Sequence, residues 1–331
     1  MDNRFNEDGL ALSGNYAETM NGVVMPALAK IRKDQTLSGA GGKPLFVSRF
    51  DAENPRGTIL VLHGFTENAD KFAELIYSLL QNRWSVLAYD QRGHGRSWRP
   101  EGLKDNSLTH VDRFSEYIRD LEIVCEQVLK KMPAPYGIFA HSMGGAVAAR
   151  FLELHDGEVF SRAVLCAPMI ACQRGGLPYF VGKAMCRGMK MIGKGKERIF
   201  MFKPFAGPED FATSCASGRE RFDWYDALRV ATPEFQNNSP SYSWTLNALG
   251  ISQKLLFPGA AEKITIPVML YGAEDDNQVI PKAQEMFIRR LKKGKMKVVP
   301  GSKHEIYRSP DAVFFPWWKE ILGFFAEENA K

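Results

Sequence analysis

The chain has 331 residues, of which 45% are hydrophobic and 24% charged, and its formal net charge at pH 7 is +5. These values are ordinary for a globular protein, and the chain shows no internal repeat or low-complexity tract. No window holds 18 uninterrupted apolar residues, and the polar N-terminus lacks an apolar signal core. We therefore expect neither a membrane-spanning helix nor a secretory signal.

Seven strands and five helices are predicted in chain order. Short apolar runs predict strands at 45–50, 58–62, 84–89, 136–139, 163–167, 266–272 and 296–299. Apolar residues at helical spacing predict helices at 69–81, 111–128, from 146 onward, at 281–291 and at 310–328. Such alternation is typical of a doubly wound, mostly parallel sheet with helices on both faces.

The alternation stops between the fifth and sixth predicted strands. Residues 170–262 are rich in Gly, Pro, Met and aromatic residues and show no strand rhythm. Because 331 residues exceed the usual size of a single core, we expect one α/β core, residues 1–169 and 263–331, with an inserted cap at 170–262. Residues 1–40 are expected to form a polar N-terminal extension that is partly helical.

The five cysteines are odd in number and lack the spacing of a metal site, at Cys125, Cys166, Cys172, Cys186 and Cys215. Cys125 and Cys166 lie in apolar periodic runs and are expected to be buried thiols. This usage indicates a reducing compartment. We therefore expect a cytoplasmic protein, with a peripheral position on the inner face of the membrane as an extension of that prediction.

Residues 137–145 read Gly-Ile-Phe-Ala-His-Ser-Met-Gly-Gly and join a predicted strand to a predicted helix. The residues two positions before and two positions after Ser142 are both small, Ala140 and Gly144. A strained turn that holds a serine hydroxyl clear of a sheet requires such neighbours. The usual pattern is G-x-S-x-G, and Ala140 replaces the first glycine. The segment predicts a nucleophile elbow with Ser142 as the nucleophile.

A serine hydroxyl needs a base within hydrogen-bond reach and an acid that orients the base. In this arrangement of elements, the acid and then the histidine follow the serine along the chain. Only His155 and His304 lie beyond Ser142. His155 ends the elbow's own helix, whereas His304 follows the last predicted strand. We therefore predict His304 as the base.

Two adjacent aspartates compete for the role of the acid. Asp276 lies three residues before Val279 and nine after Pro267, which suits the turn after a strand of the usual length. Asp275 lies three residues after Gly272, in an alternative register. Neighbours on an extended turn point in different directions, so only one of them can orient the base. We favour Asp276 and keep Asp275 as the alternative.

Charge that develops on an ester carbonyl oxygen requires preorganised N–H donors, each contributing about 3 kcal/mol. One donor is expected from Met143, directly after the nucleophile, and the other from Phe65 in the segment 63–65 after the first long apolar strand. The charged segment 90–97 is interpreted as structural, because its glycines relax a turn and its side chains can bind loop backbone. His94 precedes the nucleophile and is a less suitable base.

These motifs resemble the monoacylglycerol lipase and bacterial lysophospholipase group of α/β-hydrolases, on residues 63–65, 90–97 and 140–145. Three further segments are similar to the lysophospholipase branch, at 213–222, 239–244 and 303–306. The resemblance runs from about Pro44 to Phe325. It implies an α/β-hydrolase fold and a serine hydrolase that cleaves lipid monoesters without a metal or other cofactor.

The first part of the cap, residues 173–203, combines basic and apolar side chains. Its basic residues are Arg174, Lys183, Arg187, Lys190, Lys194, Lys196, Arg198 and Lys203, and Glu197 is its one acid. Interleaved methionines and aromatics suit a groove for variable acyl chains and a surface that contacts anionic lipid. A cap with an ordinary solvated basic face is the alternative. Nucleic acid is not expected as a partner, because the stretch is so apolar.

Together these patterns predict a serine hydrolase for the acyl ester of a lysophospholipid or monoacylglycerol, through Ser142, His304 and Asp276. A carboxylesterase for small soluble esters is the first alternative. The second is a hydrolase-like ligand sensor without catalysis, although such proteins often lose a triad member and all three candidates are present here.

Overall fold

The computed structural model describes residues 3–173 and 176–327. Within them, eight strands form one sheet in the order β1-β2-β4-β3-β6-β7-β9-β10. Their bounds are β1 (Arg32–Ser38), β2 (Pro44–Phe50), β3 (Gly57–Leu62), β4 (Trp84–Tyr89), β6 (Tyr136–His141), β7 (Arg162–Cys166), β9 (Val268–Asp275) and β10 (Gly294–Lys303). From β4 to β10 all pairings are parallel, so the carboxyl ends of these strands share one edge.

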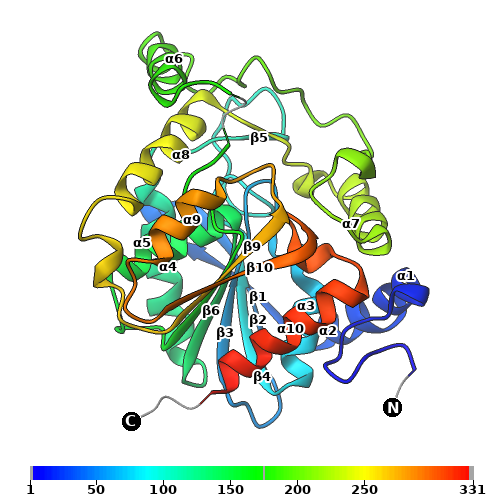
Figure 1. Cartoon of the computed structure of the whole chain (residues 1–331). Coiled ribbons are helices and arrows are strands. Elements are labelled where there is room, and N and C mark those ends of the chain that lie inside the picture. Colours follow the sequence, from blue (N-terminus) through cyan, green and yellow to red (C-terminus); the bar gives the residue numbers. More distant parts are fainter. Residues whose placement is uncertain (1–2, 174–175, 328–331) are drawn as a thin grey trace.

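The helices cover both faces of this sheet (Figure 1). Side chains of α4 (Ser115–Gln127), α5 (Ser142–Leu154) and α9 (Pro281–Ile288) pack in one apolar cluster. Side chains of α3 (Ala73–Gln81) and α10 (Asp311–Ala326) pack in a second cluster on the opposite face. The inner strands β3, β4, β6 and β7 are buried almost throughout, which explains their continuous apolar runs. The predicted α/β-hydrolase architecture is confirmed.

The N-terminal region contributes both helix and strand. It contains α1 (Tyr16–Thr19), a π-helical turn (Met20–Val24) and α2 (Met25–Ile31), which leads directly into β1. The sequence did not predict β1, because Arg32–Ser38 is mostly polar and exposed. β1 is an edge strand that pairs with β2 in antiparallel orientation, so it needs no apolar run.

The segment between β7 and β9 lies over the carboxyl edge of the sheet (Figure 1). It holds α6 (Tyr179–Met191), α7 (Arg219–Ala231) and α8 (Tyr242–Leu255). Two short strands, β5 (Leu108–Thr109) and β8 (Ser239–Pro240), pair with each other and join this segment to the core. α6 packs against α8 and forms the outermost part of the molecule (Figure 1).

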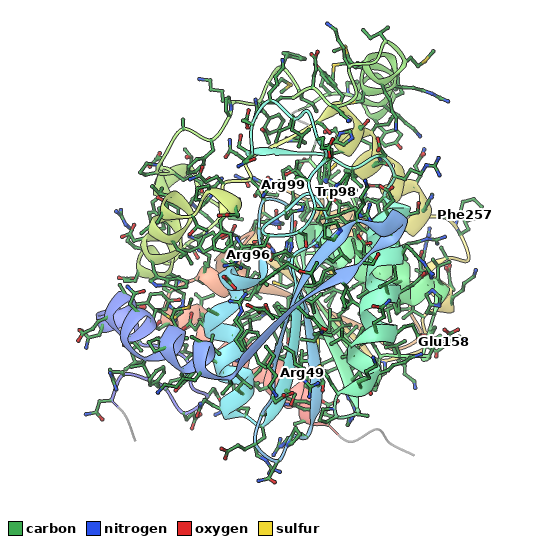
Figure 2. The ribbon with its side chains drawn as sticks, turned by 180° about the vertical axis from the view of Figure 1, so that it is seen from behind. Arg49, Arg96, Trp98, Arg99, Glu158 and Phe257 are labelled. Carbon is green, nitrogen blue, oxygen red and sulfur yellow. The ribbon has the colours of Figure 1, made fainter. Side chains whose placement is uncertain are left out.

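The loop after β4, residues 90–99, connects the core to the segment above it. Figure 2, turned by 180° from Figure 1, labels Arg96 and Arg99 of this loop. Asp90 accepts backbone N–H bonds from Ala69 and Arg96, both at 2.8 Å. Arg99 donates to Asn237 at 2.7 Å, between α7 and α8. The predicted structural role of this loop is confirmed. Within the described residues, no helix is long and apolar enough to cross a membrane.

Candidate active site

The turn from β6 into α5 holds Ser142 in a strained backbone conformation. Its φ is +49°, a region that residues other than glycine rarely occupy. A Cβ on Gly144 would lie 2.5 Å from the carbonyl oxygen of His63, so only glycine fits there. Ala140 is fully buried in β6, where its methyl group is accommodated. The turn therefore has the geometry of a nucleophile elbow.

The structure brings Ser142, His304 and Asp276 together, although the three lie far apart in the sequence. The His304 Nε2 atom lies 2.9 Å from the Ser142 Oγ, and its Nδ1 lies 2.8 Å from the Asp276 Oδ2. Ser142 and His304 are only 7% and 5% exposed. His155 lies elsewhere and pairs with Glu122 at 2.9 Å.

Asp276, rather than Asp275, faces the histidine. The second carboxylate oxygen of Asp276 accepts the backbone N–H groups of Gln278 and Val279, at 2.9 and 3.1 Å. Burial alone would raise the pKa of Asp276, but the hydrogen bonds from His304 and from this turn hold it below its usual value. Asp275 ends β9 with an exposed side chain. The carboxylate beside His304 is therefore held in its ionised form.

The two predicted oxyanion donors lie on the segments that flank Ser142. Met143 is the second residue of α5, so its N–H is among the first amides of the helix, which have no partner within the helix. Phe65 follows β3, and its ring packs on Trp244 with a centroid distance of 4.1 Å. A Cβ on the preceding Gly64 would lie 2.9 Å from the Ser142 Cβ. The Phe65 loop thus passes directly against the serine.

A cavity of about 360 Å³ opens above Ser142, beneath the cap helices. Its volume is in the usual range of small-molecule sites. Most of its wall is apolar and includes Met169, Leu177, Met185, Trp244, Leu249 and Val279. Within the described residues, no group of three or more His, Cys, Asp or Glu side chains could hold a metal ion.

Two charged residues of the site were not predicted from the sequence. Glu67 and His141 are 2% and 1% exposed, and the His141 Nδ1 lies 2.9 Å from the Glu67 Oε2. They are 74 positions apart in the sequence, so no local pattern connects them. The one available signal was that His141 directly precedes the nucleophile.

The sheet order, the elbow at the end of β6 and the serine–histidine–aspartate geometry define a serine ester hydrolase of the α/β-hydrolase fold. The chain belongs to the Hydrolase_4 family, described as serine aminopeptidase, S33, whose model matches residues 53–311.

Two relatives of this chain are named for the hydrolysis of lipid esters. The chain is 29% identical over 318 residues to lysophospholipase L2 of Escherichia coli K12, covering 90% of this chain and 89% of the relative. It is 23% identical over 288 residues to a monoacylglycerol lipase of Mycolicibacterium smegmatis, covering 86% and 94%. These relatives confirm the predicted group of α/β-hydrolases.

The fold is also similar to solved structures. A soluble variant of the Saccharomyces cerevisiae monoglyceride lipase, solved with a substrate analog, matches with a TM-score of 0.69 at 19% identity. The match covers 89% of this chain and 95% of that structure.

Proposed function

We propose that this enzyme hydrolyses the acyl ester of a lysophospholipid or monoacylglycerol through an acyl-enzyme on Ser142. The observation that carries this proposal is the 2.9 Å contact between Ser142 Oγ and His304 Nε2 at the base of a largely apolar cavity. The relatives named above act on substrates of this class.

In the proposed reaction, Ser142 Oγ attacks the ester carbonyl carbon while His304 Nε2 takes its proton. The backbone N–H groups of Phe65 and Met143 stabilise the charge on the carbonyl oxygen. His304 then gives the proton to the leaving glycerol oxygen, and the acyl group stays on Ser142. His304 then takes a proton from a water molecule, whose oxygen attacks the acyl carbon. The bond to Ser142 Oγ breaks, His304 returns the proton to that oxygen, and the fatty acid is released. Asp276 holds the imidazole in the required orientation throughout.

The outer part of the cap supports a lipid substrate. Phe180, Met191 and Phe200 are 72%, 80% and 74% exposed, an unusual position for such large apolar side chains. Met201 and Phe202 are exposed as well, at 55% and 46%, and also line the cavity. An apolar surface is therefore continuous from solvent to the chamber above Ser142.

We further propose that this surface, which we call the cap tip (residues 179–203), contacts an anionic membrane. Five exposed basic residues lie in the same segment: Arg187, Lys190, Lys194, Lys196 and Lys203. Of these, Lys190 and Lys196 also donate to backbone carbonyls, of Asp112 and Glu101. Arg198 instead pairs with Asp105 at 2.8 Å and is 12% exposed, and Lys183 donates to Gln253. Arg174 lies outside the described residues. Positive charge around an exposed apolar patch is complementary to anionic lipid.

A hydrolysis series over acyl length tests the substrate class. The enzyme is assayed on glycerol monoesters and lysophospholipids from two to eighteen acyl carbons, below their critical micelle concentrations. We expect kcat/KM to rise with chain length until the cavity is filled. A maximum at the shortest chains would instead identify a carboxylesterase for small soluble esters. Labelling of Ser142 by a fluorophosphonate without turnover of any ester would identify a ligand sensor.

A further inference from the structure

A buried ion pair lies directly beneath the proposed nucleophile. His141 precedes Ser142 in the chain, and its ring lies 4.9 Å from the His304 ring, between centroids. Glu67 follows the oxyanion loop and faces His141. Neither side chain is needed for proton transfer in the proposed reaction, and burying two such groups is costly. The pair therefore calls for a functional explanation.

The hydrogen bonds of His141 require a doubly protonated ring. Its Nδ1 faces the Glu67 carboxylate at 2.9 Å, and its Nε2 faces the backbone carbonyl of His304 at 3.2 Å. A carbonyl oxygen accepts only, so Nε2 must donate to it, and Nδ1 must donate to an ionised carboxylate. A neutral imidazole has one N–H and can satisfy one of the two. The geometry thus selects the imidazolium.

The surroundings of Glu67 select the ionised carboxylate. Its Oε2 accepts the Gly64 N–H as well as the His141 Nδ1–H. Its Oε1 accepts the Tyr307 hydroxyl and lies 3.1 Å from Lys71 Nζ. Burial alone would raise the pKa of Glu67, but the His141 and Lys71 charges and these donors hold it well below its usual value.

The same environment favours the charged histidine. Burial alone would lower the pKa of His141, but the charge and hydrogen bond of Glu67 hold it above its usual value, and the charge of Glu305 acts in the same direction. Lys71 opposes this effect, and the Tyr307 ring lies 5.1 Å away in an edge-on contact. Lys71 is itself neutralised by Glu305 at 2.6 Å.

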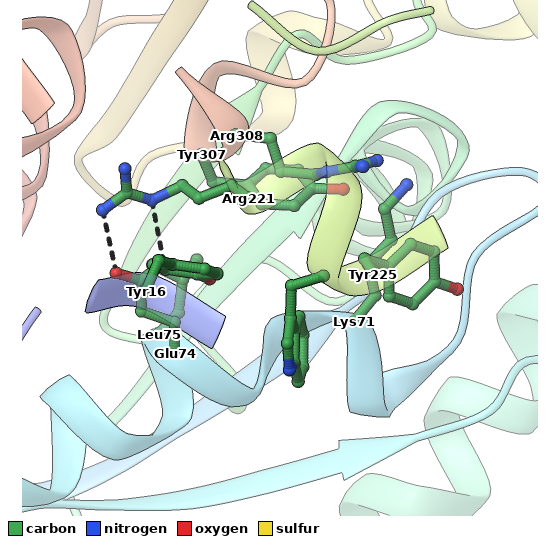
Figure 3. A pocket seen from close by; sticks show the side chains of 9 residues that line it. Tyr16, Lys71, Glu74, Leu75, Arg221, Tyr225, Tyr307 and Arg308 are labelled. Carbon is green, nitrogen blue, oxygen red and sulfur yellow. Dashed lines mark hydrogen bonds and ion pairs between the residues drawn. The ribbon is translucent and has the colours of Figure 1, made fainter. Parts of the chain in front are cut away.

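Further buried charges extend from this pair toward α7. Arg308 donates to Glu305 at 2.6 Å. Figure 3 shows Lys71, Tyr307 and Arg308 together with the Arg221 and Glu74 pair around one small cavity. The ion pair is therefore held inside a larger set of matched charges, which limits its movement.

We propose that Glu67 and His141 form a charged pair that positions the three parts of the active site. This proposal rests on the proposed ester hydrolysis. Through Gly64, the pair fixes the loop that carries the Phe65 donor. Through its own backbone, His141 fixes the elbow, and through the His304 carbonyl, it fixes the base. The two are positioning residues, because neither contacts the reacting atoms.

The expected consequence is a catalytic defect larger than any binding defect. In Glu67→Gln, the amide must present its NH₂ group to some of the donors that now surround the carboxylate. The oxyanion loop and the elbow then shift, and a displacement of about 1 Å costs about 100-fold in rate. We expect kcat on a short soluble ester to fall about 100-fold, with KM changed less than threefold.

Glu74→Gln is the matched control, because it removes another fully buried carboxylate of the same region. Glu74 binds Arg221 and Tyr16, away from Ser142. We expect this variant to lose thermal stability while the folded enzyme keeps its kcat. Equal kcat in Glu67→Gln and in wild type would overturn the proposal. So would an equal loss of kcat in both variants, because a general effect of buried charge would then explain it.

The pH dependence distinguishes positioning from stability. Because Glu67 raises the pKa of His141 and His141 lowers that of Glu67, the charged pair is complete between these two pKa values and is lost as pH rises through that of His141. Turnover should therefore fall at alkaline pH while circular dichroism still reports a folded protein. In Glu67→Gln this fall should begin at a lower pH, because the carboxylate that raises the pKa of His141 is gone. An unchanged alkaline limb would contradict the proposal.

If Glu67→Gln does not fold, the protonation state of His141 in the wild-type protein tests the proposal instead. Nitrogen-15 NMR of the histidine rings separates imidazolium from either neutral tautomer. His141 is assigned by comparison with His141→Asn. We expect both of its ring nitrogens to be protonated at pH 7, and a neutral ring would overturn the proposal. This result does not depend on ester turnover, so failure of the proposed function would be recognised separately, by a wild type that cleaves no ester.

Discussion

The region beneath Ser142 and the cap tip above it differ in burial and in the pairing of their charges. Beneath the serine, Glu67 and His141 are buried and carry opposite charges held by several hydrogen bonds. At the tip, Phe180 and Met191 are largely exposed, in a segment whose lysines at 190, 194, 196 and 203 are exposed as well. The buried pair thus holds Ser142 and His304 in place, whereas the cap tip leaves apolar surface exposed where a lipid would bind. Chemistry and substrate choice are expected to be separable by mutation.

The cap itself is divided in the same way. Arg221 of α7 is 1% exposed and pairs with Glu74 and Asp311, at 3.0 and 2.7 Å. It also donates to the Ala11 carbonyl, so it joins the N-terminal region, α3, α7 and α10. α6 has a much smaller apolar cluster with its neighbours, centred on Cys186. Helix α7 is therefore anchored to the core, whereas α6 rests mainly on α8.

The largest expected effect comes from the proposed nucleophile and base. Ser142→Ala and His304→Ala should each lower kcat by about 10⁴-fold or more on lipid and soluble esters alike, with the fold preserved. Steady-state kinetics with both substrates, and circular dichroism, measure this. Near-native turnover by Ser142→Ala would end the serine-hydrolase mechanism for this chain.

The adjacent aspartates provide a matched pair of variants. Asp276→Asn should lower kcat by about 10³- to 10⁴-fold, because the amide no longer stabilises the imidazolium that forms on His304. Asp275→Asn should stay within about twofold of wild type, since its side chain is exposed. The same soluble-ester assay compares them, and the reverse ranking would transfer the role to Asp275.

The residues in these two predictions illustrate which features of the fold and site could be predicted from the sequence and which could not. The buried strands β3, β4 and β6 follow from their apolar runs, and Ser142 follows from a local motif that constrains backbone geometry. The choice between Asp275 and Asp276 required the direction of a turn, which residue types do not encode. The pair of Glu67 and His141 could not be predicted, because it exists only once distant segments meet.

An intermediate effect, on stability, should come from the anchor of α7. Arg221→Met leaves the buried Glu74 carboxylate without its charged partner and should cost about 3–5 kcal/mol of the free energy of unfolding. Arg219→Met, two residues earlier on the same helix, breaks an exposed pair with Asp223 and should leave the free energy of unfolding almost unchanged. Urea unfolding of both variants measures the difference. Similar costs in the two would mean that Arg221 does not anchor the cap.

The smallest expected effect on chemistry comes from the cap tip. Reversing Lys190, Lys194 and Lys196 to Glu should weaken binding to anionic vesicles by at least about 3 kcal/mol, since each basic residue contributes about 1 kcal/mol. Vesicle co-sedimentation at low and high salt measures this, because salt screens the attraction. Soluble-ester turnover should stay within about twofold of wild type.

The control changes the net charge equally at another surface, by reversing Lys282, Lys292 and Lys293, which are exposed on and after α9. This variant should bind vesicles much more tightly than the cap-tip variant. If both sets weaken binding equally, net charge rather than the cap tip is responsible. If the wild type shows no salt-sensitive binding, the tip is ordinary solvated surface.

The most direct test of the separation between chemistry and substrate choice is one ratio, measured for three proteins. The ratio is kcat/KM for a long-chain lysophospholipid in anionic vesicles divided by kcat/KM for a short soluble ester. For Asp276→Asn the ratio should equal that of wild type, because both reactions lose the same chemistry. For the triple reversal at Lys190, Lys194 and Lys196, it should fall at least tenfold. An unchanged ratio in the triple variant, or a changed one in Asp276→Asn, would contradict the account.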